Sequence, residues 1–193
     1  MPRKRSNVKK RIVKASWKLF HQKGYESTTV ADIIKAAKTT KGTFYAYFKG
    51  KDALLETLAD LFDDKYEELN ETMPADMDSL KKLAYLNHEL FSMIEEEIDV
   101  RILASLYSTQ LLSKEKRFLR DHDRIYFRII TDIILDGIKK GEITAPDPAE
   151  DLMRIYSIYE HGILYDWALC DGNYSLTALS DKNIPYLLER FKR

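Results

Sequence analysis

The chain has 193 residues, of which 45% are hydrophobic and 32% charged, and its formal net charge is zero, which predicts an ordinary globular protein of one or two domains. It contains no run of about 18 apolar residues and no apolar centre within residues 1–10, so the sequence predicts neither a membrane span nor a signal peptide. The single cysteine, Cys170, excludes an internal disulfide and fits a reducing compartment, and we therefore expect a cytoplasmic protein without membrane contact.

The zero net charge hides two parts of opposite sign. Residues 1–51 hold 14 of the 31 basic residues and only two of the 31 acidic ones, Glu26 and Asp32, which gives +12, and the remainder carries −12. This division predicts a polyanion-binding function in the first part. Residues 3–5 read as a basic arm that can add phosphate or minor-groove contacts. Taken alone, the same charge would also fit a solvated face or an arm attracted to a membrane.

A first helix is predicted from about Val8 to Lys23, with Gly24 in the position that commonly ends a helix. Its apolar residues gather on one side and its lysines on the other. Tyr25, directly after it, is expected either to pack beneath the next helices or to lie on the surface.

Residues 28–55 predict two short helices joined by a tight turn and followed by the start of a longer helix. Thr29 is an N-cap for a helix over residues 30–37, whose apolar positions share one face. After a four-residue break, Thr40 caps a second helix of about two turns that ends near Phe48. Two short helices with so brief a link are typical of a helix-turn-helix, whose second helix enters the major groove of DNA.

The chemistry of the second helix fits that role. Lys41 and Thr43, at its start, carry the donor and hydroxyl groups that read base edges. Small residues allow close approach of the backbone, and Tyr45 and Lys51 are among the donors to phosphate. The alternative, a small aromatic core without DNA contact, fits the capped helices and basic surroundings less well. The predicted DNA-binding residues are Thr28, Thr29, Thr40, Lys41, Gly42, Thr43, Tyr45, Ala46, Tyr47 and Lys51.

This segment resembles the N-terminal DNA-binding domain of the TetR family of bacterial transcriptional regulators. One departure from the family pattern is Lys38, which stands at a turn position usually occupied by Gly. If the backbone there has a positive φ, Lys38 is modestly strained. The alternative is that Lys38 places another charge near phosphate. The positions that carry the resemblance are Thr28, Thr29, Ile33, Ile34, Lys41 to Tyr45, Tyr47, Phe48, Lys51, Asp52, Leu54 and Leu55.

After residue 51 the sequence becomes acidic and predicts longer helices. The first of them would join two domains as a lever. In the helix that starts near residue 148, Asp147 is the expected cap and Pro148 the first-turn residue, and Pro185 is a potential interruption of the last helix. The chain is thus divided into a helix-turn-helix domain (1–50) and, by the resemblance, a helical ligand-binding and dimerisation domain (51–193). The expected helices cover about 51–71, 77–97, 100–112, 116–140, 148–170 and 176–191.

The segment 148–170 is apolar on nearly every side. Such a helix must be covered on more than one face, which predicts a partner subunit. The resemblance implies a C2 homodimer in which the last two helices of each chain form a four-helix bundle, and Gly162 would permit close approach there. The predicted interface residues are Ile155, Tyr159, Gly162, Ile163 and Trp167.

A dimer would hold two recognition helices about one DNA turn apart, roughly 34–36 Å. The resemblance implies that an unknown small-molecule effector in the C-terminal domain changes this spacing and relieves repression. Polar or aromatic groups on apolar helices are the candidates to bind it, although each also has a plainer role in core or surface. These candidates are His88, Phe91, Tyr107, Gln110, Tyr126, His161 and Tyr165, of which His161 and Tyr165 share a helix face.

An enzyme is the alternative from another class. Cys170 and His161 are nine residues apart on one helix and lie on nearly opposite faces. The acidic residues at 95–99 lack the spacing to His that a metal site requires, and neither a phosphate-binding loop nor a nucleophile elbow is present. We therefore expect no catalysis, no cofactor and no metal. A DNA-bound structural or recruiting factor that ignores small ligands stays a further possibility.

Overall fold

The computed structural model describes residues 3–113 and 117–192, and these contain helices and no strand, which confirms the predicted all-helical fold. The first four helices are α1 (Arg3–Lys23), α2 (Val30–Ala36), α3 (Lys41–Tyr45) and α4 (Asp52–Thr72). They are followed by α5 (Ser79–Glu97), α6 (Val100–Leu112), α7 (Ile125–Lys140), α8 (Ala149–Leu169) and α9 (Leu176–Glu189). Short 3₁₀ turns occupy Phe118–Arg120 and Arg190–Lys192.

The described residues group into two compact units. The first unit comprises the residues up to 60 together with 101–119, and the second comprises 61–100 together with the residues from 120 onward. Helix α4 therefore contributes residues to both units. The predicted domain boundary after residue 50 stays a prediction.

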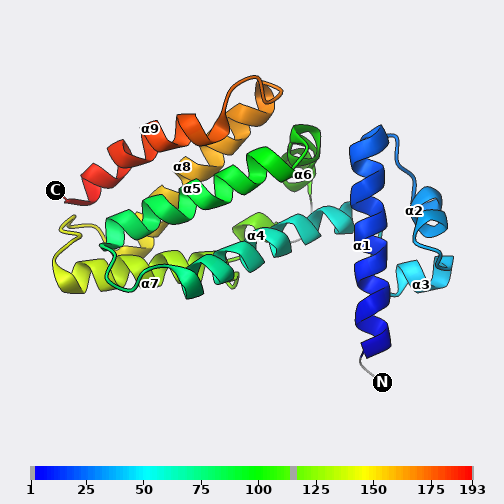
Figure 1. The fold of residues 1–193 in the computed structure, drawn as a ribbon, viewed down its shortest axis with the longest axis horizontal. Coiled ribbons are helices and arrows are strands. Elements are labelled where there is room, and N and C mark those ends of the chain that lie inside the picture. The colour runs from blue at the N-terminus through cyan, green and yellow to red at the C-terminus, as the bar shows by residue number, and fades with distance from the viewer. Residues whose placement is uncertain (1–2, 114–116, 193) are drawn as a thin grey trace. The chain divides into compact units, whose positions relative to one another are not determined.

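In the first unit, α1 packs against α2, and α2 packs against α3 (Figure 1). The side chains of Ile12, Phe20, Ile33 and Phe44 are fully buried and form the centre of this packing. The predicted end of the first helix is confirmed, since Gly24 adopts a φ of 82°, a left-handed conformation that glycine tolerates best.

In the second unit, α5 packs along α9 and α7, and α8 packs against α7 and α9 (Figure 1). At Gly137 in α7, the backbone lies close to Ser79 at the start of α5 and to Ile143. A Cβ there would lie 2.8 Å from Ile143 Cδ1 and 2.8 Å from Ser79 Cβ, so this position requires glycine. Glu142 also accepts a hydrogen bond from the backbone N of Ser79 at 2.9 Å, which satisfies a donor at the start of α5.

Several predicted elements differ from the structure. Helix α1 already begins at Arg3, where an arm before a helix from about Val8 was predicted. The predicted helix 116–140 begins outside the described residues. From residue 117 the segment is a 3₁₀ turn, a loop and then α7, because Asp121 Oδ1 accepts from the backbone N of Asp123 and turns the chain before Arg124. The N-cap of α8 is Pro148, not Asp147, and has no side-chain cap hydrogen bond. Helix α9 continues through Pro185.

Candidate nucleic-acid interface and the polar core of the second unit

The start of α2 is fixed by a reciprocal cap. Thr29 Oγ1 accepts from the backbone N of Asp32 at 3.1 Å, and Asp32 Oδ2 accepts from the backbone N of Thr29 at 2.9 Å. Lys23 Nζ lies 2.6 Å from the same carboxylate. These hydrogen bonds, first the one from Lys23 and then those from Thr29, hold the pKa of Asp32 well below its usual range. The predicted cap at Thr29 is thus confirmed and is one half of a capping box.

Helix α3 is shorter than predicted, ending with Ala46 as its C-cap, but it is capped as expected. Thr40 Oγ1 accepts from the backbone N of Thr43 at 3.1 Å, and the two threonine hydroxyl oxygens are 2.8 Å apart. Phe44 and Phe48 are buried, as predicted. The opposite surface is open, since a Cβ added at Gly42 would meet no atom within 4 Å. The exposed or half-buried residues of this surface are Thr40, Lys41, Gly42, Thr43, Tyr45, Ala46 and Tyr47.

The turn between α2 and α3 contains a residue with a positive φ, a possibility that the sequence raised for Lys38. Lys38 has a φ of 49°, in the left-handed region where a residue with a Cβ is strained. Its side chain is exposed. The structure therefore has the modestly strained backbone considered for this position, and a role of this charge near phosphate stays a prediction.

Two of the predicted DNA-contact residues make contacts within the protein, and their role in DNA binding stays a prediction. Thr28 is 1% exposed and donates from its hydroxyl to the Gly24 carbonyl at 2.8 Å. Lys51 Nζ donates to the Tyr25 carbonyl at 2.9 Å and lies 4.1 Å from the centroid of the Tyr25 ring. The Tyr25 hydroxyl donates in turn to Asp52. Burial of Tyr25 and, to a smaller extent, this hydrogen bond raise the pKa of its hydroxyl. Both residues therefore support the fold of the helix-turn-helix in this structure.

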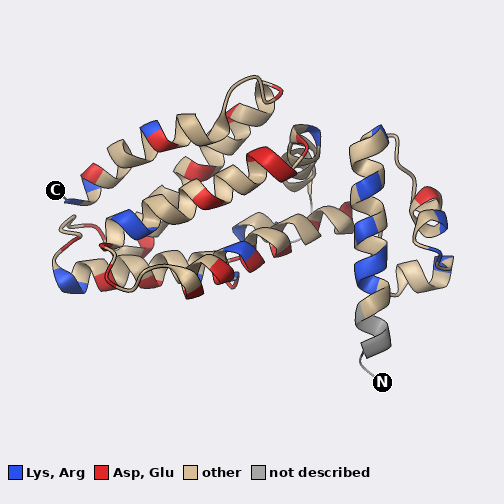
Figure 2. Cartoon of the chain, viewed as in Figure 1, with Lys and Arg blue, Asp and Glu red and all other residues tan. Residues whose placement is uncertain are grey.

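The first unit also presents cations along α1. Figure 2 shows Lys and Arg following this helix. A shallow, largely apolar groove lies along it, and its lining contains no acidic residue. The lining residues from α1 are Arg11, Lys14, Ala15, Lys18, Leu19 and Gln22, and those from the end of α2 and the turn are Ala36, Ala37 and Lys38. A surface of this charge attracts a polyanion.

The second unit contains a buried carboxylate at Glu160 on α8, which is 4% exposed. Its Oε1 accepts from Asn87 Nδ2 at 2.8 Å, and its Oε2 accepts from the Tyr126 hydroxyl at 2.7 Å. The Tyr66 hydroxyl lies 3.3 Å from both oxygens. Burial raises the pKa of Glu160 and these hydrogen bonds oppose the rise. Glu160 is not among the residues predicted from the sequence, although an acidic residue within the largely apolar segment 152–169 is a usable signal.

The predicted effector-binding residues are distributed over both units. Phe91 and Tyr126 are buried in the second unit, where Tyr126 contacts Glu160. His161 is half-buried, and burial, with a smaller effect of Arg124 and Arg120, lowers its pKa to about 4. The remaining predicted residues lie elsewhere. His88 pairs with Asp181 at 2.9 Å on the surface, Tyr165 is exposed, and Tyr107 and Gln110 belong to α6 in the first unit.

The predicted interface residues on α8 occupy different faces. Ile163 and Trp167 are buried within the chain, and Trp167 Nε1 donates to the Tyr174 carbonyl at 2.9 Å. Their role in a dimer interface stays a prediction. Tyr159 is half-buried, whereas Ile155 and Gly162 are exposed. The exposed positions form one stripe, namely Ile155, Ile158, Gly162, Tyr165 and Leu169.

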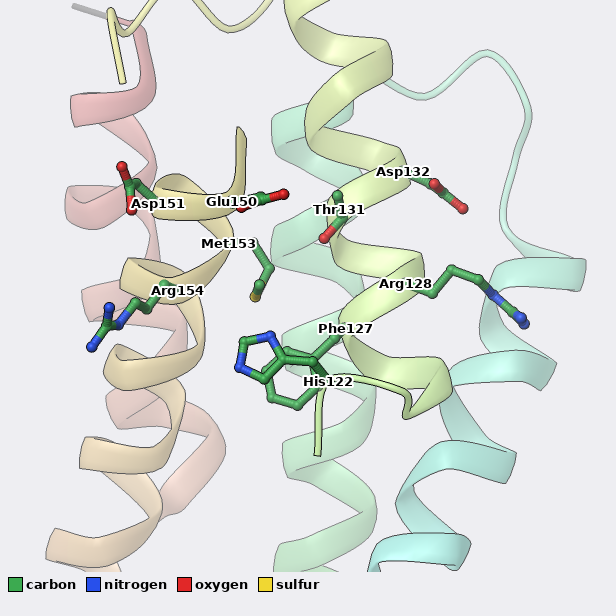
Figure 3. Close-up of a pocket in the computed structure, with 9 residues that line it drawn as sticks. All are labelled: His122, Phe127, Arg128, Thr131, Asp132, Glu150, Asp151, Met153 and Arg154. Atoms are coloured by element: carbon green, nitrogen blue, oxygen red, sulfur yellow. The ribbon is translucent and has the colours of Figure 1, made fainter. Parts of the chain in front are cut away.

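A separate cleft of about 420 Å³ lies between α7 and the start of α8 in the second unit (Figure 3). The ring of His122 stacks on that of Phe127 with 4.8 Å between centroids and 5° between planes. The lining of the cleft carries Arg128 and Arg154 but also Asp132, Glu150 and Asp151, so the positive and negative charges nearly balance. None of the predicted site residues lines this cleft.

Two features are absent from the part of the chain that the structure describes. Within residues 3–113 and 117–192, no group of three or more His, Cys, Asp or Glu side chains is placed to hold a metal ion. In the same part of the chain, no helix combines the length and the apolar character that crossing a membrane requires.

Taken together, the capped α2 and α3, the open surface of α3 and the cationic α1 define a helix-turn-helix DNA-binding protein. Comparison with known proteins gives the family. Residues 12–58 match the family model described as "Bacterial regulatory proteins, tetR family". This match identifies the N-terminal segment as a DNA-binding domain of the TetR family of transcriptional regulators.

The similarity to individual relatives extends beyond that domain. The chain is 26% identical over 182 residues to the fatty acid metabolism regulator protein of Bacillus subtilis (strain 168), covering 92% of each chain. It is 25% identical over 184 residues to the HTH-type transcriptional regulator HbdR of Aromatoleum sp. (strain CIB), covering 93% of this chain and 79% of that protein.

Solved structures share the fold. A TetR-family transcriptional repressor, FadR of Thermus thermophilus, in complex with lauroyl-CoA, has a TM-score of 0.76 at 23% identity, covering 94% of this chain and 93% of that one. FadR from Bacillus subtilis in complex with stearoyl-CoA has a TM-score of 0.70 at 24% identity, covering 93% of this chain and 97% of that one.

Proposed function

We propose that the protein is a homodimeric cytoplasmic repressor that binds operator DNA through α2 and α3 and leaves it when a small molecule binds in the second unit. The observation that carries this proposal is the helix-turn-helix itself, with its capped helices and an open α3 surface bearing Lys41 and Thr43. The runner-up is a DNA-bound recruiting factor that ignores small ligands.

The exposed stripe on α8 supports the dimer. Its members Ile155, Ile158, Gly162, Tyr165 and Leu169 follow one another at spacings of three and four residues, the pattern of a helix that packs along another helix. Ile158 is 54% exposed and Leu169 is 65% exposed, which is costly for side chains of this type unless a partner covers them. A second copy of α8 offers the same stripe and so makes a self-complementary interface.

Fatty acyl-CoA is the first effector to test. The support is the full-length similarity to a fatty acid metabolism regulator and the two solved FadR structures that hold acyl-CoA. A long apolar chain also matches the chemistry of the second unit, whose interior includes Phe91, Tyr126 and Phe127. The effector acts only if it binds the DNA-incompetent conformation more tightly than the other.

The test has two steps. The purified protein first selects its operator from a random pool of duplex DNA, and the selected site is expected to be palindromic because two related recognition helices read it. Lauroyl-CoA and stearoyl-CoA are then added to the protein–operator complex in a gel-shift experiment, with CoA lacking an acyl chain as the matched control. Release by either acyl-CoA and not by CoA is the expected result. Retention with both, and with a wider set of apolar metabolites, would favour the recruiting factor.

A further inference from the structure

The groove along α1 is separate from the surface proposed to read DNA. Its lining includes three exposed cations of α1, namely Arg11, Lys14 and Lys18. Lys38, in the turn after α2, adds an exposed cation from the other element that forms the groove. None of the lining residues belongs to α3, whose open surface carries the candidates for base reading. The groove is therefore a second surface of the first unit.

The remainder of the lining is largely apolar. Ala15 and Leu19 of α1 are half-buried, so part of their apolar surface still faces the solvent. Ala37, at the end of α2, lies beside them and is buried. Arg11 Nε donates to the Ala37 carbonyl at 3.3 Å, which ties α1 to the end of α2 and so fixes the groove. A partner that covers this apolar surface gains free energy from its burial.

No carboxylate offsets the cations of the groove. Its lining contains no acidic residue, and the sequence of α1 has no Asp or Glu along its whole length. The one acidic residue of α2, Asp32, is already paired with Lys23 at 2.6 Å. Figure 2 shows the Lys and Arg residues along α1 without Asp or Glu between them. The groove is thus complementary to a partner that combines negative charge with apolar side chains.

The dimensions of the groove match those of a helix. Its lining on α1 extends from residue 11 to residue 22, which spans about 16 Å, or about three turns of a helix. Its volume is about 550 Å³, and it is shallow, whereas a small-molecule site encloses most of its ligand. A helix with an apolar stripe needs cover on one face only, and such helices commonly bind in apolar grooves.

We propose that this groove binds an acidic amphipathic helix of another protein. Apolar side chains that recur every three or four residues contact Ala15 and Leu19, and carboxylates beside that stripe pair with Lys14 and Lys18. Duplex DNA is the other polyanion that these cations attract, but its phosphate backbone has no apolar side chains to cover the lining. Binding of a protein here requires no small molecule, so the proposal goes beyond the ligand response in the proposed function.

The probe is a labelled peptide of about 14 residues, about four helical turns, built from Leu, Glu and Ala. Its leucines lie on one face with glutamates on either side, and a hydrocarbon staple on the far face holds it helical, which removes the cost of folding on binding. One control peptide has the same composition in scrambled order, so that its leucines form no stripe. The second control carries Lys in place of every Glu.

Fluorescence anisotropy on the full-length protein without DNA gives the dissociation constants. The probe is expected to bind at least about tenfold more tightly than either control. Scrambling leaves leucines in water that the groove otherwise covers, and covering even one of them is worth roughly that factor. The peptide with Lys in place of Glu is repelled by the cations of the groove.

Two pairs of substitutions locate the binding. Lys14→Ala together with Lys18→Ala removes two cations from the groove and should weaken probe binding about three- to tenfold. The matched control, Lys9→Ala together with Lys10→Ala, removes two exposed cations of the same helix outside the lining and should weaken it by less than about twofold. Leu19→Ala should weaken probe binding without a change of charge. Circular dichroism verifies that each variant is folded.

Equal affinity for the probe and the scrambled peptide would overturn the proposal, since the groove would then be a general surface for polyanions. Equal losses in the two pairs of lysine variants, or no binding of the probe, would overturn it as well. A role in DNA binding would instead appear as no binding of the probe together with weaker binding of random duplex DNA by the Lys14 and Lys18 variant than by the Lys9 and Lys10 variant. Operator selection and release by acyl-CoA are measured separately, so failure of this proposal is distinguishable from failure of the proposed function.

Discussion

Lys51 lies over the ring of Tyr25, with its ammonium nitrogen 4.1 Å from the ring centroid, and donates to the backbone carbonyl of the same residue at 2.9 Å. This contact ties the start of α4 to the loop that precedes α2. Lys51→Ala removes a charged hydrogen bond and a cation–π contact, so we expect the free energy of unfolding to fall by about 1–2 kcal/mol. Urea unfolding measures the change.

Lys35→Ala, which removes an exposed lysine on α2, is the matched control and should change stability far less. The sequence-based expectation for Lys51 was a phosphate contact, whose loss would flatten the salt dependence of DNA binding by about one unit. Unchanged stability of Lys51→Ala together with a flatter salt dependence would favour that expectation over the structural role.

The base-reading role of α3 is testable at its two N-terminal side chains. Lys41→Ala and Thr43→Ala should alter base preference at individual operator positions, each by about 1–3 kcal/mol. Tyr45 is 48% exposed and is a candidate for contact with phosphate. Tyr45→Phe should therefore weaken binding to operator and random DNA alike. Competition binding against a panel of single-base operator variants measures both effects. A uniform loss in Lys41→Ala and Thr43→Ala would reassign these residues to phosphate.

The two faces of α8 should respond differently to the same substitution. Ile155→Glu or Ile158→Glu introduces a charge into the exposed stripe and should produce a folded monomer. Ile163→Glu places a charge in the interior of the subunit and should lower the melting temperature itself. Sedimentation combined with thermal unfolding separates the two effects. An intact dimer in both stripe variants would place the interface elsewhere.

His161 should make the protein sensitive to mild acid. Its pKa is lowered to about 4, so between pH 6.5 and 4 the unfolded chain binds a proton there and the folded chain does not. The free energy of unfolding therefore falls as the pH drops through this range. The loss is about 2 kcal/mol when reduced for the partial exposure of the ring.

Urea unfolding at pH 7 and pH 4.5 tests this expectation in the wild type and in His161→Gln. The variant should lose about 2 kcal/mol less than the wild type over this interval. Glu160, whose raised pKa acts in the opposite direction, is present in both proteins, so its contribution cancels in the comparison. Equal losses in the two proteins would show that His161 titrates normally.

Much of the fold could be predicted because its signals are local. The caps at Thr29 and Thr40 and the helix end at Gly24 depend on residues a few positions apart, and the structure has them where the sequence placed them. The start of α7 was missed, because the Asp121 side chain forms a turn within a segment that apolar periodicity alone reads as one helix.

The sequence by itself determined that this protein is helical, that its first fifty residues are cationic, and that they contain a helix-turn-helix. Tertiary structure alone decided which face of α8 is covered within the chain and which stays exposed, and it alone brought Glu160 together with Tyr66, 94 positions earlier. Caps and periodicity act between neighbours along the chain. The partner of a buried carboxylate depends on how separate helices pack, and no local pattern contains that information.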